Sequence, residues 1–261
     1  MSRGPIIAID GPAGAGKSTV ARHLAQHFGL LNLETGAMYR AFALKAILAD
    51  IDFDDPAALE RLARDTEITL EADRHANRVY LDGQDVTERI RDSDVTQGAS
   101  RVSVHPTIRC WMVDLQRELG SRGGVVMEGR DIGTVVFPDA DIKVFLDASP
   151  EARSQRRYEQ NSVTRDPLPN SGYEQNAGTR EQNAAVRTRM ESASPADRAV
   201  VSQDLRERDE RDRNRASSPL RPAPDAIVID STNLRLEEVL ARIEKLVRPL
   251  FASQDEATPV G

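Results

Sequence analysis

The sequence predicts an α/β protein built on a parallel sheet of about five strands with helices on both faces, and three observations predict it. Short apolar runs alternate along the chain with segments whose apolar residues recur at helical spacing, which is typical of strand–helix–strand units. A glycine-rich loop separates the first apolar run from the first helical segment. Polar residues follow several of the runs, at the positions where ligands bind an open parallel sheet.

The glycine-rich loop fits the pattern G-x-x-x-x-G-K-[ST] without a mismatch. It lies between a buried strand expected at residues 5–9 and a helix that ends near Gly29. Its glycines let several backbone N–H groups point at phosphate oxygens, and its lysine adds a positive charge for the β- and γ-phosphates. Its serine is the expected protein ligand of Mg²⁺, so the loop predicts a P-loop with a nucleoside triphosphate and Mg²⁺. The residues of this loop are Gly11, Pro12, Ala13, Gly14, Ala15, Gly16, Lys17 and Ser18.

The elements before residue 105 begin with a second parallel strand at 30–34, where the residues are mostly apolar. A polar turn at Thr35-Gly36 follows, and then a helix over about 37–49. Asp55-Pro56 marks the start of another helix. From 66 to 87 the pattern changes from helical to alternating, which predicts a small antiparallel sheet inserted between helices.

The elements after residue 105 restore the strand and helix alternation. Pro106 begins a helix that ends at Gly120. The apolar run 125–127 is the third core strand, and Glu128 at its carboxyl end occupies the place where P-loop enzymes keep the carboxylate that orients the water ligands of Mg²⁺. A fourth strand, a fifth strand and a last helix are expected at 142–146, 226–229 and 236–246.

The segment between the fourth and fifth strands is the least core-like part of the chain. A basic helix at 152–158 leads into residues 160–195, which are rich in Asn, Gln, Ser, Gly and Pro and predict mobility. The charged run 206–215 allows two interpretations. It is either a solvent-exposed helix with i,i+4 ion pairs, or a helix that directs arginines from one face toward an anion.

Composition narrows the class of protein. The 261 residues carry a net charge of -7, and a sequence pI of about 5.3 disfavours a general nucleic-acid binder, which needs a basic face. A single cysteine, the short stretch before the first strand and the lack of a membrane-length apolar run predict a cytoplasmic protein.

His23 and His27, four residues apart, are interpreted as exposed helix residues rather than metal ligands. Residues 251–261 are expected to form a flexible tail.

Three functions are compatible with the P-loop at this point: a kinase for a small acceptor, a GTPase-like switch, or an ATPase that acts on nucleic acid or protein. The chain has no [NT]-K-x-D guanine motif, and its acidic composition disfavours the third class. Four arginines in segments expected at the carboxyl edge of the sheet favour a phosphorylated acceptor. Such an acceptor is already largely dianionic at neutral pH, so no general base is needed. These arginines are Arg40, Arg130, Arg208 and Arg215.

Four motifs in order resemble the bacterial cytidylate kinase family, which belongs to the nucleoside monophosphate kinases. They are Gly11 to Thr19, Thr35 to Arg40, Glu128 to Pro138 and Arg208 to Arg215, and the resemblance extends to about Leu250. It implies a single P-loop kinase domain over 1–250, with a monophosphate-binding region at 36–105 and a mobile lid at 150–215. It also implies ATP as phosphate donor and CMP or dCMP as acceptor. We expect the protein to be a monomer that binds neither nucleic-acid polymers nor membranes.

The resemblance further assigns roles to individual residues. Ser100, Arg109 and Asp131 would read the cytosine edge, and Asp131 can accept a hydrogen bond from the exocyclic amino group, so UMP should be a poor substrate. Thr35 would lie near the base or sugar, and Glu128 would act on Mg²⁺ through water. Another small-molecule kinase of this fold, for a different nucleotide or for shikimate, is the alternative. The remaining implied residues are Lys17, Arg130 and Arg215 for catalysis, Thr19 and Arg157 for ATP, Arg208 and Asp212 for the sugar hydroxyls, Arg40, Arg130 and Arg215 for the acceptor phosphate, and Tyr39 for the substrate.

Overall fold

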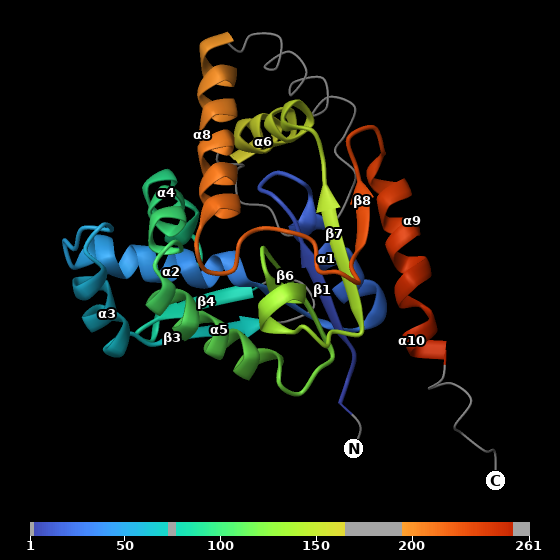
Figure 1. The fold of residues 1–261 in the computed structure, drawn as a ribbon, viewed down its shortest axis with the longest axis horizontal. Helices are drawn as coiled ribbons and strands as arrows, with labels where there is room; N and C mark the ends of the chain where they lie inside the picture. Colours follow the sequence, from blue (N-terminus) through green and yellow to red (C-terminus); the bar gives the residue numbers. More distant parts are fainter. Residues whose placement is uncertain (1–2, 73–76, 165–194, 253–261) are drawn as a thin grey trace, which may run out of the picture.

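A five-stranded parallel sheet forms the centre of the protein (Figure 1). The computed structural model describes residues 3–72, 77–164 and 195–252. The strand order is β2-β6-β1-β7-β8, and every pairing is parallel. The strand that enters the P-loop is therefore central, as a doubly wound sheet requires, and the predicted fold class is confirmed. The strands are β1 (Ile6–Asp10), β2 (Leu31–Glu34), β6 (Val125–Gly129), β7 (Ile142–Asp147) and β8 (Ile227–Asp230).

Helices cover both faces of this sheet, which explains the continuous apolar run of β1. Ile7 and Ile9 face α1 (Lys17–Phe28) and α9 (Leu236–Val247), within one core cluster. Ile6 and Ala8 face the other side, in a cluster that includes side chains of α5 (Pro106–Gly120) and of the short helical segment η2 (Ile132–Val136). Because successive strand residues point to opposite faces, both sets must be apolar.

The segment between β2 and β6 forms a region with its own core around Phe42 and Leu59. Its small sheet is antiparallel and lies within the predicted range 66–87. The prediction of a turn at Thr35-Gly36 is wrong, since a helix begins at Thr35 directly after β2. The Thr35 hydroxyl donates a hydrogen bond to the Glu128 carbonyl at 2.9 Å. The elements here are α2 (Thr35–Leu48), α3 (Pro56–Arg64), β3 (Ile68–Ala72), β4 (Asn77–Leu81), β5 (Gln84–Asp85), η1 (Arg89–Arg91) and α4 (Ser93–Val102).

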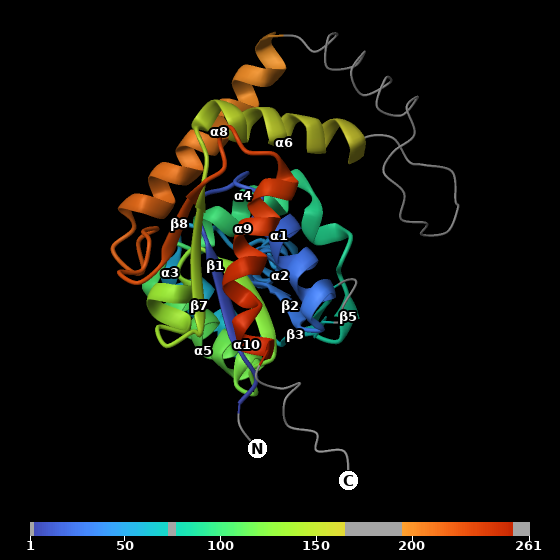
Figure 2. The same ribbon diagram turned by 90° about the vertical axis from the view of Figure 1, so that its right-hand side faces the viewer.

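Two helices, α6 (Pro150–Thr164) and α8 (Pro195–Asn214), lie beyond the carboxyl end of β7 (Figures 1 and 2). The helix α6 continues past the predicted end at residue 158. The prediction of mobility for 160–195 falls mainly on 165–194, which lie outside the described residues. None of the described helices is long and apolar enough to cross a membrane.

The chain beyond α9 packs on the core for longer than predicted. A short helix, α10 (Pro249–Ala252), follows α9, and Phe251 stacks on Phe28 of α1 with ring centroids 4.9 Å apart. The tail prediction is therefore wrong at 251–252, because an aromatic side chain gains from burial against α1. The rest of that prediction, 253–261, lies outside the described residues.

Candidate active site

The P-loop joins β1 to α1, as its sequence predicts. Gly11 and Gly16 adopt φ angles of 147° and 99°, and a Cβ on Gly11 would meet the carbonyl oxygen of Leu146. The buried Lys17 ammonium donates to the Pro12 carbonyl at 2.8 Å. Burial and the nearby charge of Arg130 lower the pKa of Lys17 to about 7. The loop thus holds a lysine whose positive charge is poorly compensated by the protein.

The two predicted Mg²⁺ residues lie together at this loop. The Ser18 hydroxyl donates to Glu128 Oε1 at 2.8 Å, although the two residues belong to α1 and β6. Glu128 is buried, and its backbone carbonyl accepts from Thr35. A hydroxyl beside a carboxylate is a hard oxygen donor set, which fits the preference of Mg²⁺ for oxygen ligands. These residues therefore fit the expected cation.

Three of the four predicted acceptor-site arginines, Arg130, Arg208 and Arg215, gather around Asp212 of α8, and the charge of the fourth, Arg40, acts on Arg208. Arg130 Nε donates to Asp212 Oδ2 at 2.8 Å, and Arg215 Nη1 lies 3.4 Å from Asp212 Oδ1. Burial, together with repulsion from Arg130, Arg40 and Arg157, lowers the pKa of Arg208 to about 10. Such a cluster of like charges, with one carboxylate among them, fits an anion with more than one negative charge.

Two of the three predicted base-reading residues, Arg109 and Asp131, are in contact, and the third, Ser100, is buried one helical turn before Ser103. Arg109 of α5 is almost fully buried and pairs with the buried Asp131 after β6, while its second nitrogen donates to the Ser103 carbonyl at 3.2 Å. The Arg109 guanidinium lies over the ring of Tyr39 at 5.6 Å. Arg215 Nη2 lies 3.9 Å from Asp131 Oδ1, which connects this pair to the arginine cluster.

Buried polar atoms with no hydrogen-bond partner gather in the same residues. Within the described part of the chain, these include the hydroxyl groups of Ser100 and Tyr39, Nε of Arg109 and Nη2 of Arg215. Burial raises the pKa of Tyr39 to about 12, so its hydroxyl stays protonated and can donate. An unpaired buried polar group costs about 1–3 kcal/mol, so the three at Tyr39, Arg109 and Arg215, which lie near one another, indicate that a polar ligand fits there.

Two arginines that the sequence did not single out contact the P-loop from α6. Arg153 donates to the Ala13 carbonyl at 3.1 Å and Arg156 to the Ala15 carbonyl at 3.4 Å. Arg153 also pairs with Asp209 of α8, with Nη1 2.6 Å from Oδ2. The predicted Arg157 instead donates to Gln160 at 3.1 Å. The sequence signal was the basic run of α6, whose spacing does not reveal which arginine faces the loop.

Asp10, the last residue of β1, is a second feature that the sequence did not reveal. Its carboxylate accepts hydrogen bonds from the backbone N–H of Ile132 at 2.8 Å and of Gly133 at 2.7 Å. These amides follow directly after Arg130 and Asp131, so the hydrogen bonds to Asp10 connect the segment that carries these two residues to the P-loop strand.

Two other predicted residues, Arg40 and Thr19, lie on α2 and α1. Arg40 Nη2 donates to Glu34 Oε1 at 2.6 Å, and Thr19 is exposed on α1 next to Ser18.

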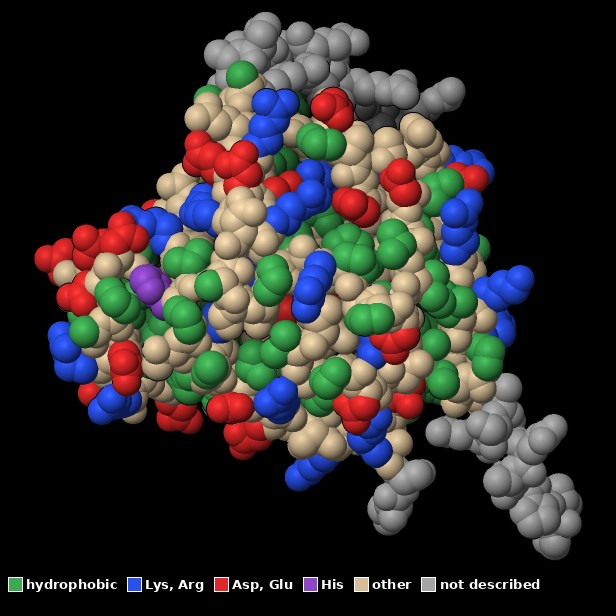
Figure 3. All heavy atoms as spheres, in the orientation of Figure 1, with side chains coloured by type: hydrophobic (Ala, Val, Ile, Leu, Met, Phe, Trp, Pro, Cys, Tyr) green, Lys and Arg blue, Asp and Glu red, His purple; other side chains and the backbone are tan. Residues whose placement is uncertain are grey.

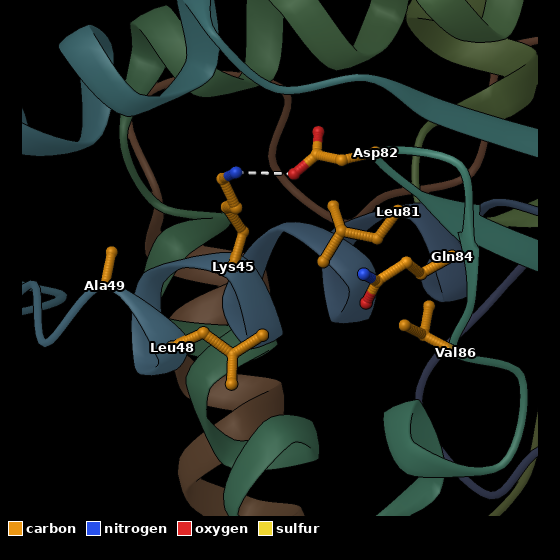
Figure 4. A pocket seen from close by; sticks show the side chains of 7 residues that line it. All are labelled: Lys45, Leu48, Ala49, Leu81, Asp82, Gln84 and Val86. Carbon is orange, nitrogen blue, oxygen red and sulfur yellow. Dashed lines mark hydrogen bonds and ion pairs between the residues drawn. The ribbon is translucent and has the colours of Figure 1, made fainter.

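A separate cavity of about 220 Å³ lies between α2 and the turn of β4 and β5 (Figure 4). None of the predicted site residues lines it. Its lining residues are Lys45, Leu48, Ala49, Leu81, Asp82, Gln84 and Val86.

The surface charge gives no sign of a polymer-binding face on the side shown in Figure 3, where acidic and basic side chains are interspersed. The cations instead converge beside the P-loop, since Arg130 and Arg208 both act on the Lys17 ammonium. The fold and this second anion site define a P-loop kinase of small phosphorylated substrates.

The family follows from comparison with known proteins. The family model described as cytidylate kinase matches residues 7–183 and 177–249. A cytidylate kinase of Pelotomaculum thermopropionicum is 47% identical over 93% of this chain and 96% of its own length. One from Solibacter usitatus is 44% identical over 93% and 92%. The chain belongs to the cytidylate kinase family and is a phosphotransferase that uses ATP and a nucleoside monophosphate.

Among solved structures, a shikimate kinase from Acinetobacter baumannii aligns over 94% of both chains. The identity is 17% and the TM-score is 0.37, and a similarity that low carries no argument about the reaction.

Proposed function

We propose that the acceptor is CMP or dCMP and that the Asp131–Arg109 pair reads the cytosine. The supporting observation is that this ion pair is buried beside Tyr39, whose hydroxyl lacks a partner in the described chain, as does the buried hydroxyl of Ser100. Cytosine presents an amino donor next to the N3 and O2 acceptors. A carboxylate beside an arginine and hydroxyl groups complements that edge, whereas uracil presents a carbonyl where cytosine has its amino group.

The acceptor phosphate is proposed to bind among the arginines around Asp212. Arg40, Arg130 and Arg215 would hold it, and Arg208 with Asp212 would bind the sugar hydroxyls. Because the phosphate is already largely dianionic near neutral pH, it needs no general base to remove a proton. Catalysis then consists of alignment of the two substrates and neutralisation of charge on the transferred phosphoryl group, with Lys17 acting from the donor side.

Ser18 and Glu128 would hold Mg²⁺, Ser18 directly and Glu128 through water. When bound, the ion neutralises charge on the donor phosphates and orients them. The chain's own contribution is to place two oxygen donors, which are 2.8 Å apart in the structure, at the end of the P-loop. We further propose that the protein acts in the cytoplasm as a monomer.

The test is an ADP-release assay with ATP and Mg²⁺ across CMP, dCMP, UMP, AMP and shikimate. We expect CMP and dCMP to be used far better than UMP, by a factor that can reach about 10⁴ when buried polar groups lose their partners. Asp131→Asn should reduce kcat/KM for CMP and narrow the ratio between CMP and UMP. Equal use of CMP and UMP by the native protein would refute the role of Asp131, and a preference for AMP or shikimate would refute the acceptor.

A further inference from the structure

A histidine pair on α1 and a carboxylate on α9 form a cluster outside the active site. His23 and His27 lie one turn apart, and their rings stack with centroids 5.8 Å apart and an interplanar angle of 11°. Glu244 approaches from α9, with Oε1 2.6 Å from His23 Nε2. One ligand atom from each of the three residues lies within 4.8 Å of the other two.

We propose that these three residues, the α1–α9 cluster, bind a divalent transition-metal ion of the Zn²⁺ type. Imidazole nitrogens and a carboxylate oxygen are common ligands of Zn²⁺, and histidines four residues apart on a helix point to the same side. The same donors also suit Ni²⁺ and Cu²⁺, so the ligand set defines a class of ion. Three protein ligands leave a fourth position for water.

The distances in the cluster suit such an ion. Zinc bonds of about 2.0–2.2 Å in a tetrahedral arrangement place neighbouring ligand atoms about 3.3–3.6 Å apart. The ligand atoms of the cluster span separations from 2.6 Å between His23 and Glu244 to no more than 4.8 Å. Rotation of the side chains is enough to reach the bound geometry, and His27 is exposed and has room to rotate.

The backbones that carry the ligands are held by other contacts. Leu24 of α1 and Ile243 of α9 are fully buried in one core cluster, and Phe28 stacks on Phe251 beneath the site. Figure 2 shows α1 and α9 side by side along this face. An ion would therefore find its ligands already placed, so binding does not have to organise the two helices.

The environment also leaves the ligand atoms accessible. Side-chain exposure is 37% for His23 and 19% for Glu244, so both can be reached from solvent. Arg248 Nη2 lies 3.6 Å from Glu244 Oε2, while Glu244 Oε1 lies against His23. The positive charge of Arg248 lowers the affinity for a cation, but the Arg248 side chain is largely exposed, so solvent screens this effect.

The experiment titrates the full-length protein, stripped of metal and free of nucleotide, with Zn²⁺ alone and Co²⁺ alone. Calorimetry measures Zn²⁺ affinity, and the visible spectrum of Co²⁺ reports its ligands. His27→Ala is the critical variant, because it removes a ligand that is exposed and keeps the hydrogen bond between His23 and Glu244. Loss of even an outer-shell partner costs about 10- to 100-fold in metal affinity, so we expect at least about a 10-fold loss in His27→Ala and in Glu244→Gln.

Glu237→Gln is the matched control, because Glu237 is an exposed carboxylate on α9, the helix that carries Glu244. It should leave the Zn²⁺ affinity unchanged. Zn²⁺ should also raise the Tm of the native protein and of Glu237→Gln, and at the same Zn²⁺ concentration the rise should be smaller for His27→Ala. Native-like Zn²⁺ affinity in both ligand variants would overturn the proposal, since any bound ion would then lie elsewhere, for example at Ser18 and Glu128. No measurable Zn²⁺ binding by the native protein would overturn it as well. Neither outcome depends on the identity of the acceptor nucleotide.

Discussion

Replacement of Asp10 by asparagine tests how the substrate side of the site is attached to the P-loop strand. Asp10 accepts hydrogen bonds from the backbone N–H of Ile132 and Gly133, and burial raises its pKa to about 6 from 3.8. Asparagine has nearly the same shape, but it cannot ionise and offers one acceptor oxygen in place of two. One of the two buried N–H groups therefore loses its partner, at a cost of about 1–3 kcal/mol in the free energy of unfolding.

The pH dependence separates this constant cost from the titration of Asp10. Because its pKa is higher in the folded protein, the carboxyl contributes stability that is complete below the unfolded value of 3.8 and is lost as the pH rises through about 6. At 1.36 kcal/mol per unit, that contribution is about 3 kcal/mol at low pH, about 1.4 kcal/mol at pH 5 and close to zero at pH 8. The native protein should therefore lose about 1.4 kcal/mol relative to Asp10→Asn between pH 5 and pH 8.

Urea unfolding of both proteins at several pH values between 5 and 8 measures this difference directly. Groups that do not interact with Asp10 titrate alike in both proteins and cancel in the comparison. Lys17 does interact with Asp10, but this interaction is the smallest of the causes that set either pKa, so it adds only a smaller change to the difference. Asp65→Asn, at an exposed aspartate, is the control for the effect of removing a carboxylate. A difference between native protein and Asp10→Asn that stays constant over this range would refute the assignment of a raised pKa to Asp10.

Three further substitutions test the P-loop and its contacts. Lys17→Ala should abolish phosphoryl transfer in the ADP-release assay while the thermal unfolding transition is retained, and residual transfer near the native rate would exclude this loop as the donor site. Arg153→Ala leaves Asp209 buried without its partner and should cost about 3–5 kcal/mol in urea unfolding, so a loss under 1 kcal/mol would show that the pair is not needed. Gly11→Ala places a Cβ against the Leu146 carbonyl at a positive φ and should lower Tm and ATP affinity together, and an unchanged Tm would contradict the close approach.

The architecture was predictable because the relevant signals are local. A parallel strand buried on both faces must be apolar throughout, so the run that became β1 was visible in the sequence. Proline at the first helical position marked the starts of α3 and α5, and both helices begin there. The prediction of a turn at Thr35-Gly36 was wrong, because Thr35 is fixed by a hydrogen bond to Glu128, a residue on a different strand.

The site was only partly predictable, because its internal contacts join residues from distant segments of the chain. The motifs indicated that Arg130, Asp131 and the charged run 206–215 would gather at the carboxyl edge of the sheet, and the structure brings them together. The pairings inside that group depend on tertiary packing. Charge spacing alone allowed i,i+4 ion pairs along the surface of α8, whereas Asp209 and Asp212 pair with arginines of other segments. No local pattern distinguishes these two arrangements.

The electrostatics of the unliganded protein explain why this site favours two phosphorylated substrates. Lys17 and Arg208 both have lowered pKa values because they are buried and lie near other cations, chiefly Arg130. Assembly of these charges destabilises the folded protein, since each cation repels the next in a poorly solvated place. Asp212 offsets only part of this repulsion. In the function proposed above, phosphate groups on the donor and the acceptor would relieve the rest, and the same cations that cost stability would supply the affinity and the charge neutralisation that phosphoryl transfer requires.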